Sequence, residues 1–480
     1  MDPYRLLFHL MPPQGWLNDP NGLCQFHGTY HVFFQYSPEN AEGGLKLWGH
    51  YTSTDLIHWN YEGAPLVPDR EYDKDGVYSG CAFLHEDQMY LYYTGNVKQP
   101  GIHDFVHSGR EANTVLVTSK DGKQFSPKEC IMTNADYPEE YTCHIRDPKV
   151  WQQDGRFYMV QGGRLKGDKG TVLVFQSEDL RQWSFHNDVT ISESFGYMWE
   201  CPDYFELPVD MQPGAQMNQR ILSLSPQGLE AETYRYQNIY QSGYFRVVGD
   251  ITQDAKLQEF TEWDMGFDFY APQTFQDEQG RRILIGWAGM PDADYDNLPT
   301  VKQGWQHALT VPRELIWRNG RICQNPVSEL EQLRQDFSQL PEGKKFELMK
   351  EQGMEYTVRK AYEIEIAEID SADFLVKFDQ NGSGFALQYT EEVFSLEFYG
   401  EKAAQIGRGR TKRQFNLDRL QKCRILLDTS LVEVYLNDGE YALTSRYYIE
   451  NDRFHGEIHC QNGNRSMWEW KGYQCADTFL

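Results

Sequence analysis

A regular repeat limits the folds open to this chain. Five short apolar segments, most of them rich in aromatic residues, start about 60 residues apart. They are Tyr30–Tyr36, Met89–Thr94, Arg156–Gln161, Arg220–Ser225 and Arg281–Trp287. Most of them follow a polar turn, as strands of a hairpin do. This period is close to the length of one four-stranded propeller blade with long loops, so the sequence predicts five blades.

A second repeat lies between these segments. A Ser, an Asp and an aromatic residue recur at matching spacing in Thr52–Trp59, Thr118–Phe125 and Gln176–Trp183. The pattern predicts the same edge strand and hairpin in three blades. The alternative is a set of unrelated β-meanders that look alike because turns use few residue types.

The pattern changes after Pro326. Ser328 and Glu331 are spaced as a capping box, and Leu330, Leu333, Phe337 and Leu340 follow at helical spacing, which predicts one short amphipathic helix. Short alternating segments typical of a β-sandwich follow: Ala361–Ile366, Phe374–Phe378, Val393–Phe398, Arg424–Asp428 and Val432–Leu436. We therefore predict an all-β protein. A five-bladed β-propeller (1–326) is followed by a helical linker (327–342) and a C-terminal β-sandwich (343–480).

Composition narrows the class of function. A net charge of −26 over 480 residues repels nucleic-acid phosphates and anionic membranes, so it favours a small-molecule ligand. The nine cysteines include no CxxC pair, which predicts reduced thiols rather than a disulfide framework. No secretion leader or membrane-spanning run is recognised, so a cytoplasmic protein is predicted. No interface is identified, and the oligomeric state stays open.

Three carboxylates are candidates for chemistry. Asp19 lies in WLNDPNG (16–22), where proline and Asn-Gly predict a turn that holds it. Asp147 lies in HIRDP and Glu200 in WECPD, and all three are expected on loops that precede or close different blades. A propeller gathers such side chains toward its central channel, so one pocket can hold them.

Each acid also has an ordinary interpretation. Asp19 can belong to a surface turn, Asp147 can form a local ion pair with Arg146, and Glu200 can be a half-buried structural acid. A carboxylate packed against apolar neighbours nevertheless suits a general acid. The three together are therefore more informative than any one of them.

Seven motifs resemble, in order, those of glycoside hydrolase family 32, which includes invertases, fructanases and intracellular sucrose-6-phosphate hydrolases. They are WLNDPNG, WGHYTSTDLIHW (48–59), YSG (78–80), RDP, EC, DFYAPQ (268–273) and GWQHALTVPREL (304–315). LVEVYLNDGE (431–440) is similar to the C-terminal sandwich of that family. The resemblance covers nearly the whole chain, and the fold of the family, a five-bladed propeller followed by a sandwich, agrees with the repeat.

The resemblance implies a retaining double displacement on a β-fructofuranoside. Asp19 is then the nucleophile that hydrogen bonds keep ionised, Glu200 the acid and base, and Asp147 the stabiliser of the transition state. Retaining glycosidases place the nucleophile and the acid about 5 to 5.5 Å apart. The substrate-binding residues implied are Asn18, Gln35, Ser79 and Arg146 for hydrogen bonds to fructose, and Trp16, Tyr78 and Trp287 for apolar walls.

One departure from the family pattern concerns the wall of this pocket. Many members carry a tryptophan shortly before WGH, whereas residues 40–47 (NAEGGLKL) contain none, so another side chain must fill that wall. The substrate is expected to be sucrose, sucrose 6-phosphate or a short fructo-oligosaccharide. A phosphate would need cations, and the candidates are Arg164, Lys166, Lys169, His103 and His107, each of which can equally be a solvated loop residue.

Other functions stay open at this point. Fructosyl transfer needs the same three acids, and a fructan-binding propeller without catalysis would be favoured only if one acid were replaced. A five-bladed glycosidase acting on arabinosides or xylosides would also place three acids centrally. No metal or cofactor is expected, because the sequence has no HExxH cluster and no glycine-rich phosphate loop.

Overall fold

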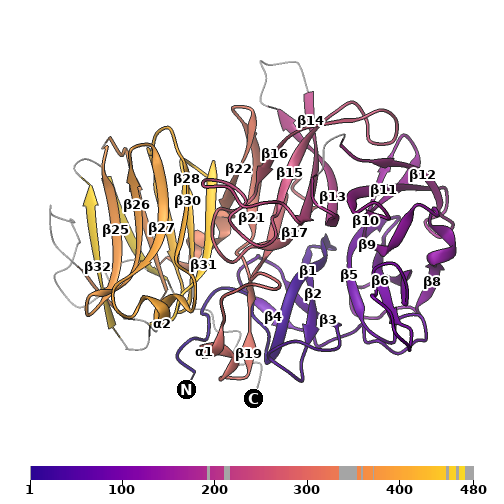
Figure 1. Ribbon diagram of the computed structural model, residues 1–480, viewed down its shortest axis with the longest axis horizontal. Helices are drawn as coiled ribbons and strands as arrows, with labels where there is room; N and C mark the ends of the chain where they lie inside the picture. Colours follow the sequence, from indigo (N-terminus) through magenta and orange to yellow (C-terminus); the bar gives the residue numbers. More distant parts are fainter. Residues whose placement is uncertain are drawn as a thin grey trace.

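The computed structural model is built almost entirely of β-strands (Figure 1). It describes residues 2–191, 195–209, 217–334, 354–357, 361–370, 372–449, 453–460 and 464–470. No helix among these residues is long and apolar enough to span a membrane. Every cysteine in the described ranges is a free thiol.

Five four-stranded units form the N-terminal part, drawn from indigo to salmon in Figure 1. The units are β1 (Gly15–Phe26), β2 (Thr29–Ser37), β3 (Leu47–Ser53) and β4 (Trp59–Tyr61); β5 (Val77–His85), β6 (Gln88–Lys98), β7 (Arg110–Ser119) and β8 (Glu129–Met132); β9 (Tyr141–Gln153), β10 (Arg156–Leu165), β11 (Lys169–Ser177) and β12 (Ser184–Val189); β13 (Met198–Val209), β14 (Met217–Gln227), β15 (Gly243–Val248) and β16 (Lys256–Glu262); and β17 (Tyr270–Gln276), β18 (Arg282–Ala288), β21 (Arg313–Arg318) and β22 (Arg321–Pro326).

The first strands of these units surround a common axis. Around the ring, β1 contacts β5, β5 contacts β9, β9 contacts β13, β13 contacts β17, and β17 contacts β1. β19 (Trp305–Gln306) comes from late in the chain and pairs in parallel with β1, which joins the last blade to the first. The predicted all-β propeller is confirmed.

The two sequence repeats correspond to fixed places in a blade. The five apolar segments are the second strands β2, β6, β10, β14 and β18. In β2, Val32 and Phe34 pack into one core cluster and Phe33 into another, because a blade is covered on both faces by its neighbours. This two-sided burial explains why the segments are continuously apolar rather than alternating.

The second repeat forms the turn between the third and fourth strands of three blades. Ser53, Ser119 and Ser177 end β3, β7 and β11, and each hydroxyl donates to the Asp two residues later at 3.0 to 3.2 Å. In the first blade, Asp55 then accepts the backbone N–H groups of the following turn. The prediction of a shared hairpin is therefore confirmed for these blades.

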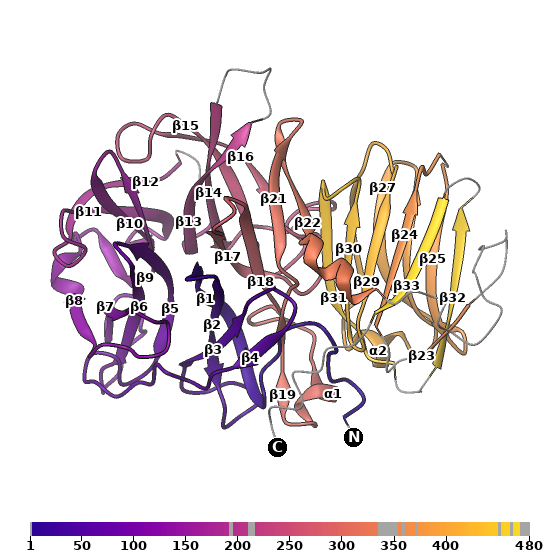
Figure 2. The same cartoon turned by 180° about the vertical axis from the view of Figure 1, so that it is seen from behind.

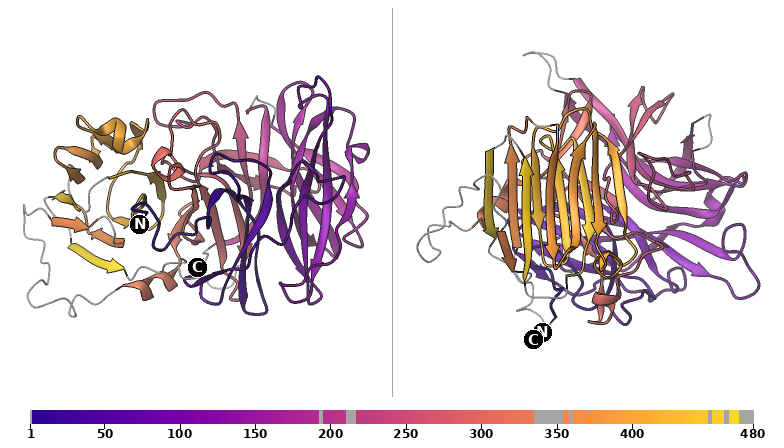
Figure 3. Two further views of the ribbon diagram at one scale, coloured as in Figure 1. Left: turned by 90° about the horizontal axis from the view of Figure 1, so that it is seen from below. Right: turned by 60° about the vertical axis from the view of Figure 1, so that its left-hand side comes forward.

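Two packed sheets form the C-terminal part, drawn in orange and yellow (Figures 2 and 3). One sheet has the order β23-β32-β25-β26-β27-β28 and the other β31-β30-β29-β24-β33. The strands are β23 (Met354–Thr357), β24 (Ala361–Ala367), β25 (Phe374–Gln380), β26 (Ser383–Thr390), β27 (Val393–Tyr399), β28 (Lys412–Asn416), β29 (Cys423–Leu427), β30 (Leu431–Leu436), β31 (Tyr441–Arg446), β32 (Arg453–Cys460) and β33 (Asn464–Trp470).

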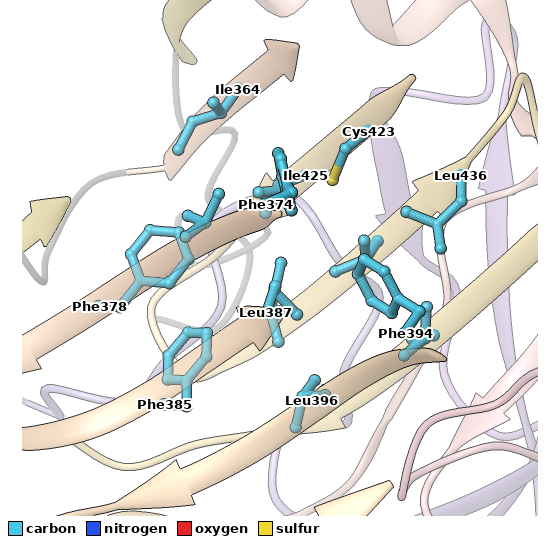
Figure 4. Close-up of a cluster of buried hydrophobic side chains, with 14 of the residues drawn as sticks. Ile364, Phe374, Phe378, Phe385, Leu387, Phe394, Leu396, Cys423, Ile425 and Leu436 are labelled. Atoms are coloured by element: carbon cyan, nitrogen blue, oxygen red, sulfur yellow. The ribbon is translucent and has the colours of Figure 1, made fainter. Parts of the chain in front are cut away.

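The sandwich core contains side chains from both sheets. Phe378, Phe385 and Leu396 of one sheet and Ile364 and Ile425 of the other belong to a single buried cluster (Figure 4). Burying inward-facing residues from two sheets is what stabilises such a sandwich. The predicted sandwich strands are therefore confirmed.

The connection between the two parts differs from its prediction. A 3-10 helix, η2 (Ser328–Leu333), replaces the expected amphipathic α-helix, and its buried side chains are Leu330 and Leu333. The predicted capping box is wrong, because the helix starts at Ser328 itself and Val327 occupies the cap position without a side-chain hydrogen bond. Phe337 and Leu340 lie outside the described residues.

Fully buried charges join the propeller to the sandwich. Arg313 of β21 donates to Glu433 of β30 at 2.7 Å and to Asp264 at 3.1 Å. His9, from the N-terminal segment, contacts Glu433 at 2.8 Å. Burial disfavours the charged carboxylate, but Arg313 and then His9 outweigh it and lower the pKa of Glu433 to about 2.

Replacing Glu433 by Gln is expected to lower the free energy of unfolding by about 3 kcal/mol, because it leaves Arg313 buried and poorly paired. The pKa of Glu433 in the folded protein lies below its ordinary value of 4.5, so this contribution is present above pH 4.5 and is lost as pH falls toward 2. Urea unfolding between pH 2 and 7 measures both effects. Glu129→Gln, which breaks an exposed pair with Arg181, should cost less than about 1 kcal/mol. Equal effects of the two substitutions would contradict the expectation.

Candidate active site

The three candidate acids lie on the first strands of three blades. Asp19 belongs to β1, Asp147 to β9 and Glu200 to β13. The predicted loops, and the predicted turn at Asp19, are therefore wrong, because the strands continue through all three positions. The central ring of first strands brings together acids that lie 53 to 181 residues apart in sequence.

Bulges in the first strands set the direction of these side chains. The pairing with the second strand slips at matching places: Leu17 to Pro20, Val77 to Gly80, Arg146 to Lys149, Glu200 to Asp203 and Tyr270 to Gln273. Inside the last three bulges, Asp147 (φ 64°), Cys201 (φ 48°) and Ala271 (φ 45°) adopt the left-handed conformation. Bulges re-aim side chains, and strained backbone of this kind is concentrated at functional sites.

Asp19 is surrounded by hydrogen-bond donors. Asn18 Nδ2 donates to Asp19 Oδ1 at 3.1 Å, and the Ser79 hydroxyl donates to Oδ2. Gln35 Nε2 lies 3.4 Å from Oδ2 and also donates to Ser79. Trp16 Nε1 donates to Asn18 Oδ1 at 2.9 Å, which fixes the orientation of the Asn18 amide. Three residues predicted to form hydrogen bonds with fructose thus hold one carboxylate, and a fourth residue predicted to bind fructose orients one of them.

Burial dominates the pKa of Asp19. It raises this pKa above its ordinary value, the hydrogen bonds from Ser79 and Asn18 act in the opposite direction, and the charge of Glu200 raises it further. The hydrogen bonds predicted to keep Asp19 ionised are present, but they do not outweigh burial. The ionised form of Asp19 therefore depends on each donor.

Ser79→Ala is expected to move the acid limb of the kcat/KM profile to higher pH, because it removes a donor that lowers the pKa of Asp19. Since the folded pKa rises further, the carboxylate becomes protonated at a higher pH than in the unchanged enzyme. The loss at neutral pH should be about tenfold for one charge-assisted hydrogen bond. A pH profile with sucrose tests this, with Ser79→Thr as the variant that keeps the hydroxyl. An unshifted acid limb would contradict the role of Ser79.

Glu200 is held on both oxygens. Arg146 donates to Oε1 from Nε at 3.1 Å and from Nη2 at 2.5 Å. Tyr270 and Gln227 donate to Oε2 at 2.7 Å and 2.8 Å. Arg146 therefore pairs with Glu200 of the next blade, and not with its neighbour Asp147 as the alternative interpretation of Asp147 would have it. Gln227 has no signal in the sequence, whereas Tyr270 lies in the motif DFYAPQ.

Asp147 connects three blades. Its Oδ2 accepts the backbone N–H of Cys201 at 2.8 Å, and its own N–H donates to Thr94 at 3.0 Å. Burial raises the pKa of Asp147 to about 7, although the positive charge of Arg146 partly opposes the shift. These two hydrogen bonds hold Asp147 in place next to the carboxylates of Asp19 and Glu200.

Three aromatic rings pack together beside the acids. The ring of His307 lies 4.3 Å from Trp16 and 5.0 Å from Trp287, and the two indoles are 6.0 Å apart. Among the described residues, neither ring nitrogen of His307 nor the indole N–H of Trp287 has a hydrogen-bond partner. His307 lies in the motif GWQHALTVPREL but was not predicted to belong to the site. Tyr78 is half-buried beside the bulge of β5.

A lysine from the segment that contains no tryptophan lies beside Trp16. The ammonium of Lys46 lies 4.8 Å from the ring of Trp16, where cation and indole attract each other. Burial lowers the pKa of Lys46 to about 8, and the negative charge of Asp19 opposes this shift. The sequence showed that residues 40–47 contain no tryptophan, but it did not predict the contact between Lys46 and Trp16.

Some of the cations suggested for a phosphate have other partners. Arg164 pairs with Asp168 at 2.7 Å, and His107 pairs with Asp104 at 2.9 Å. His103 contacts Ser108 at 3.2 Å. Lys166 is exposed and Lys169 half-buried on the same hairpin. Across the described part of the chain, no three His, Cys, Asp or Glu side chains are grouped as metal ligands.

Comparison with known proteins adds independent evidence. Residues 9–326 match the family model described as "Glycosyl hydrolases family 32 N-terminal domain", and residues 331–470 match "Glycosyl hydrolases family 32 C terminal". A sucrose-6-phosphate hydrolase of Bacillus subtilis is 39% identical over 93% of this chain and 89% of its own. A raffinose invertase of Escherichia coli is 36% identical over 95% and 92%.

Solved structures share the fold. A Bombyx mori GH32 beta-fructofuranosidase mutant in complex with sucrose superimposes with a TM-score of 0.82 at 29% identity, covering 99% of this chain and 95% of that one. A sucrose-6-phosphate hydrolase from Lactobacillus gasseri superimposes with a TM-score of 0.83 at 24% identity, covering 99% and 94%. With both family models matched in order along the chain, this protein belongs to glycoside hydrolase family 32.

Proposed function

We propose that this protein is a retaining β-fructofuranosidase that hydrolyses sucrose, sucrose 6-phosphate or short fructo-oligosaccharides and releases fructose. The observation that carries the proposal is the meeting of Asp19, Asp147 and Glu200 at one end of the propeller axis. Donors hold both oxygens of Asp19 and both oxygens of Glu200. The relatives named as sucrose-6-phosphate hydrolases and as a raffinose invertase support the same class of substrate.

The chemistry follows from these positions. Asp19 attacks the anomeric carbon of fructose, and the carbon–oxygen bond to the leaving group breaks while Glu200 protonates that oxygen. Glu200 then takes a proton from water, which displaces the carboxylate of Asp19 from the sugar. Asp147 accepts hydrogen bonds from fructose hydroxyls while positive charge develops on the ring. Two inversions at one carbon give net retention.

The arrangement around each acid suits its proposed part. Asn18 donates a hydrogen bond to one oxygen of Asp19 and Ser79 donates to the other. The two bonds keep the carboxylate in one fixed orientation for attack. Tyr270 and Gln227 hold one oxygen of Glu200 while Arg146 holds the other. The pocket wall of Trp16, His307 and Trp287 can cover the apolar face of a furanose ring.

Product analysis tests the proposal. With sucrose in aqueous methanol, we expect NMR to show methyl β-fructofuranoside beside free fructose, because methanol intercepts the fructosyl enzyme from the same face. In water, glucose and fructose should appear in equal amounts. Glucose in excess, together with trisaccharides, would assign the protein to fructosyl transfer. The α-anomer, or no release from any fructoside, would overturn the proposal.

Domain limits and location belong to the same proposal. We assign residues 1–326 to the catalytic propeller, 327–342 to the linker and 343–480 to the sandwich, supported by the end of β22 at Pro326. A cytoplasmic location is supported by free thiols such as Cys24 and Cys201, since disulfides are rare in reducing compartments. Cell fractionation tests the location.

A further inference from the structure

Lys46 is a half-buried cation in the group of side chains around the three acids. Its ammonium lies 4.8 Å from the centre of the Trp16 ring and makes no hydrogen bond or ion pair with the residues that the structure describes. An indole attracts a cation, but burying an ammonium without a counter-charge is costly. The proposed attack by Asp19 and proton transfer by Glu200 leave this charge without a part in the reaction.

The pairing of strands brings Lys46 level with Trp16. Trp16 of β1 pairs with Ser37 of β2, and Leu47, the first residue of β3, pairs with Tyr36. Lys46 precedes Leu47 and Ser37 follows Tyr36, so Lys46, Ser37 and Trp16 come in one row across the blade. Residues in one row of a sheet point to the same face, which accounts for the contact between the ammonium and the indole.

The backbone of Lys46 also joins the first blade to the second. Its carbonyl oxygen accepts the N–H of Val77, the first residue of β5, at 2.9 Å. Ser79 follows two residues later in β5 and donates to Asp19. Lys46 is therefore held next to the strand that supplies a donor to Asp19, while its side chain lies on Trp16.

The positive charges are divided among the three acids. Arg146 donates twice to Glu200, and burial raises the pKa of Asp147 while Arg146 opposes this rise. Burial is also the main cause of the raised pKa of Asp19; among the charged groups, Glu200 raises this pKa further and Lys46 lowers it. Burial lowers the pKa of Lys46 to about 8, and the charge of Asp19 opposes this change. Arg146 thus serves two of the acids, and Lys46 serves the third.

Two other titratable groups face Lys46. Tyr78 lies beside its stem, since a Cβ at Gly76 would be 2.8 Å from the Tyr78 ring and 3.6 Å from Lys46 Cβ. Burial and then nearby cations, Lys46 among them, lower the pKa of His307 well below its ordinary value, so that imidazole stays neutral. The carboxylate of Asp19 is thus the negative charge that acts on Lys46.

We infer that Lys46 is a positioning residue for the nucleophile: its ammonium, fixed over Trp16, supplies the counter-charge of the Asp19 carboxylate. The inference rests on the proposed function, in which Asp19 attacks as an anion. The hydrogen bonds to Asp19 come from an amide and a hydroxyl, which are neutral donors, so the positive charge must come from elsewhere. No direct ion pair joins Lys46 to Asp19, so the charge favours the ionised form without covering the attacking oxygen.

The pH dependence of kcat/KM for sucrose tests the inference. Lys46→Met keeps an unbranched side chain against Trp16 but removes the charge. The pKa of Asp19 then rises further, so we expect the acid limb to move up by about half a pH unit or more, which lowers kcat/KM on that limb about threefold. Lys46→Arg keeps the charge and should leave the limb in place. Lys166→Met, which removes an exposed lysine, is the matched control.

A second measurement does not depend on turnover. In protein labelled with ¹³C at the lysine Cε, an NMR titration follows Lys46, whose signal is assigned by its absence from Lys46→Arg. Coupling between two charges is reciprocal, so Asp19→Asn should lower the pKa of Lys46 below its value of about 8. The titration of the exposed Lys166 should not change.

The outcomes separate this inference from the proposed function. If Lys46→Met is active and its acid limb does not move, Lys46 only packs on Trp16 and the inference is overturned, while the proposed function stands. An unchanged titration of Lys46 in Asp19→Asn overturns it as well. If the unchanged protein releases no fructose from any fructoside, the proposed function fails, and with it the nucleophile that Lys46 would serve.

Discussion

Asp19→Ala is expected to lower kcat for sucrose by at least about 10⁴-fold, which corresponds to about 5.5 kcal/mol of lost transition-state stabilisation. The proposed attack forms a covalent bond from Asp19 to fructose, and no other carboxylate is held by Asn18 and Ser79 in the same way. Rapid quenching and mass spectrometry should detect a fructosyl adduct on the unchanged enzyme and none on the variant.

The controls for this prediction separate chemistry from folding. The buried carboxylate of Asp19 carries a raised pKa, so its removal should not lower the melting temperature. Asp154→Asn changes an exposed carboxylate in the hairpin before β10, at a left-handed position that Asn tolerates, and should keep full activity. More than about 1% of the original turnover in Asp19→Ala would exclude Asp19 as the nucleophile.

Glu200→Gln is expected to lower kcat/KM for sucrose by about 10³-fold, because the alkoxide of glucose leaves poorly without a proton. An aryl β-fructofuranoside with an acidic phenol as leaving group should lose less than about tenfold in kcat/KM, since its first step needs little proton transfer. Its kcat should still fall, because Glu200 also activates water in the second step.

A second variant keeps this prediction testable. The amide of Gln disturbs the four donors around Glu200, so Glu200→Ala should be measured as well. Azide is expected to accelerate turnover of the aryl substrate by Glu200→Ala, giving a β-fructosyl azide. Equal losses on both substrates, together with no rescue, would show that Glu200 is not the acid and base.

Much of the fold could be predicted from the sequence. The repeat of apolar segments identified the second strand of every blade, because those strands are buried on both faces and leave a continuous apolar pattern. The Ser and Asp repeat identified a turn, because the side chain of Asp55 bonds to backbone groups only two or three residues away. These hydrogen bonds join residues close together in the chain, so a turn of this kind can be predicted from its own sequence without knowing which strands pair.

The sequence predicted which residues belong to the candidate site but not how they are arranged. The family motifs named Asp19, Asp147 and Glu200, yet the sequence placed them on loops, whereas they lie in bulged strands. A bulge depends on the register between two strands, which no single segment specifies. The capping box at Ser328 failed for a related reason, because the hydrogen-bond partners of its hydroxyl depend on where the helix begins.

The sequence by itself determined the order of strands, the change from propeller to sandwich and the identity of the three acids. The tertiary structure alone decided that Arg146 bonds to Glu200, that Tyr270 and Gln227 complete the contacts of Glu200, and that Lys46 lies over the ring of Trp16. Strand patterns and turns arise from neighbours in the chain. The partners and pKa values of buried charges arise from closing the ring of blades, which brings distant segments together and removes water from between them.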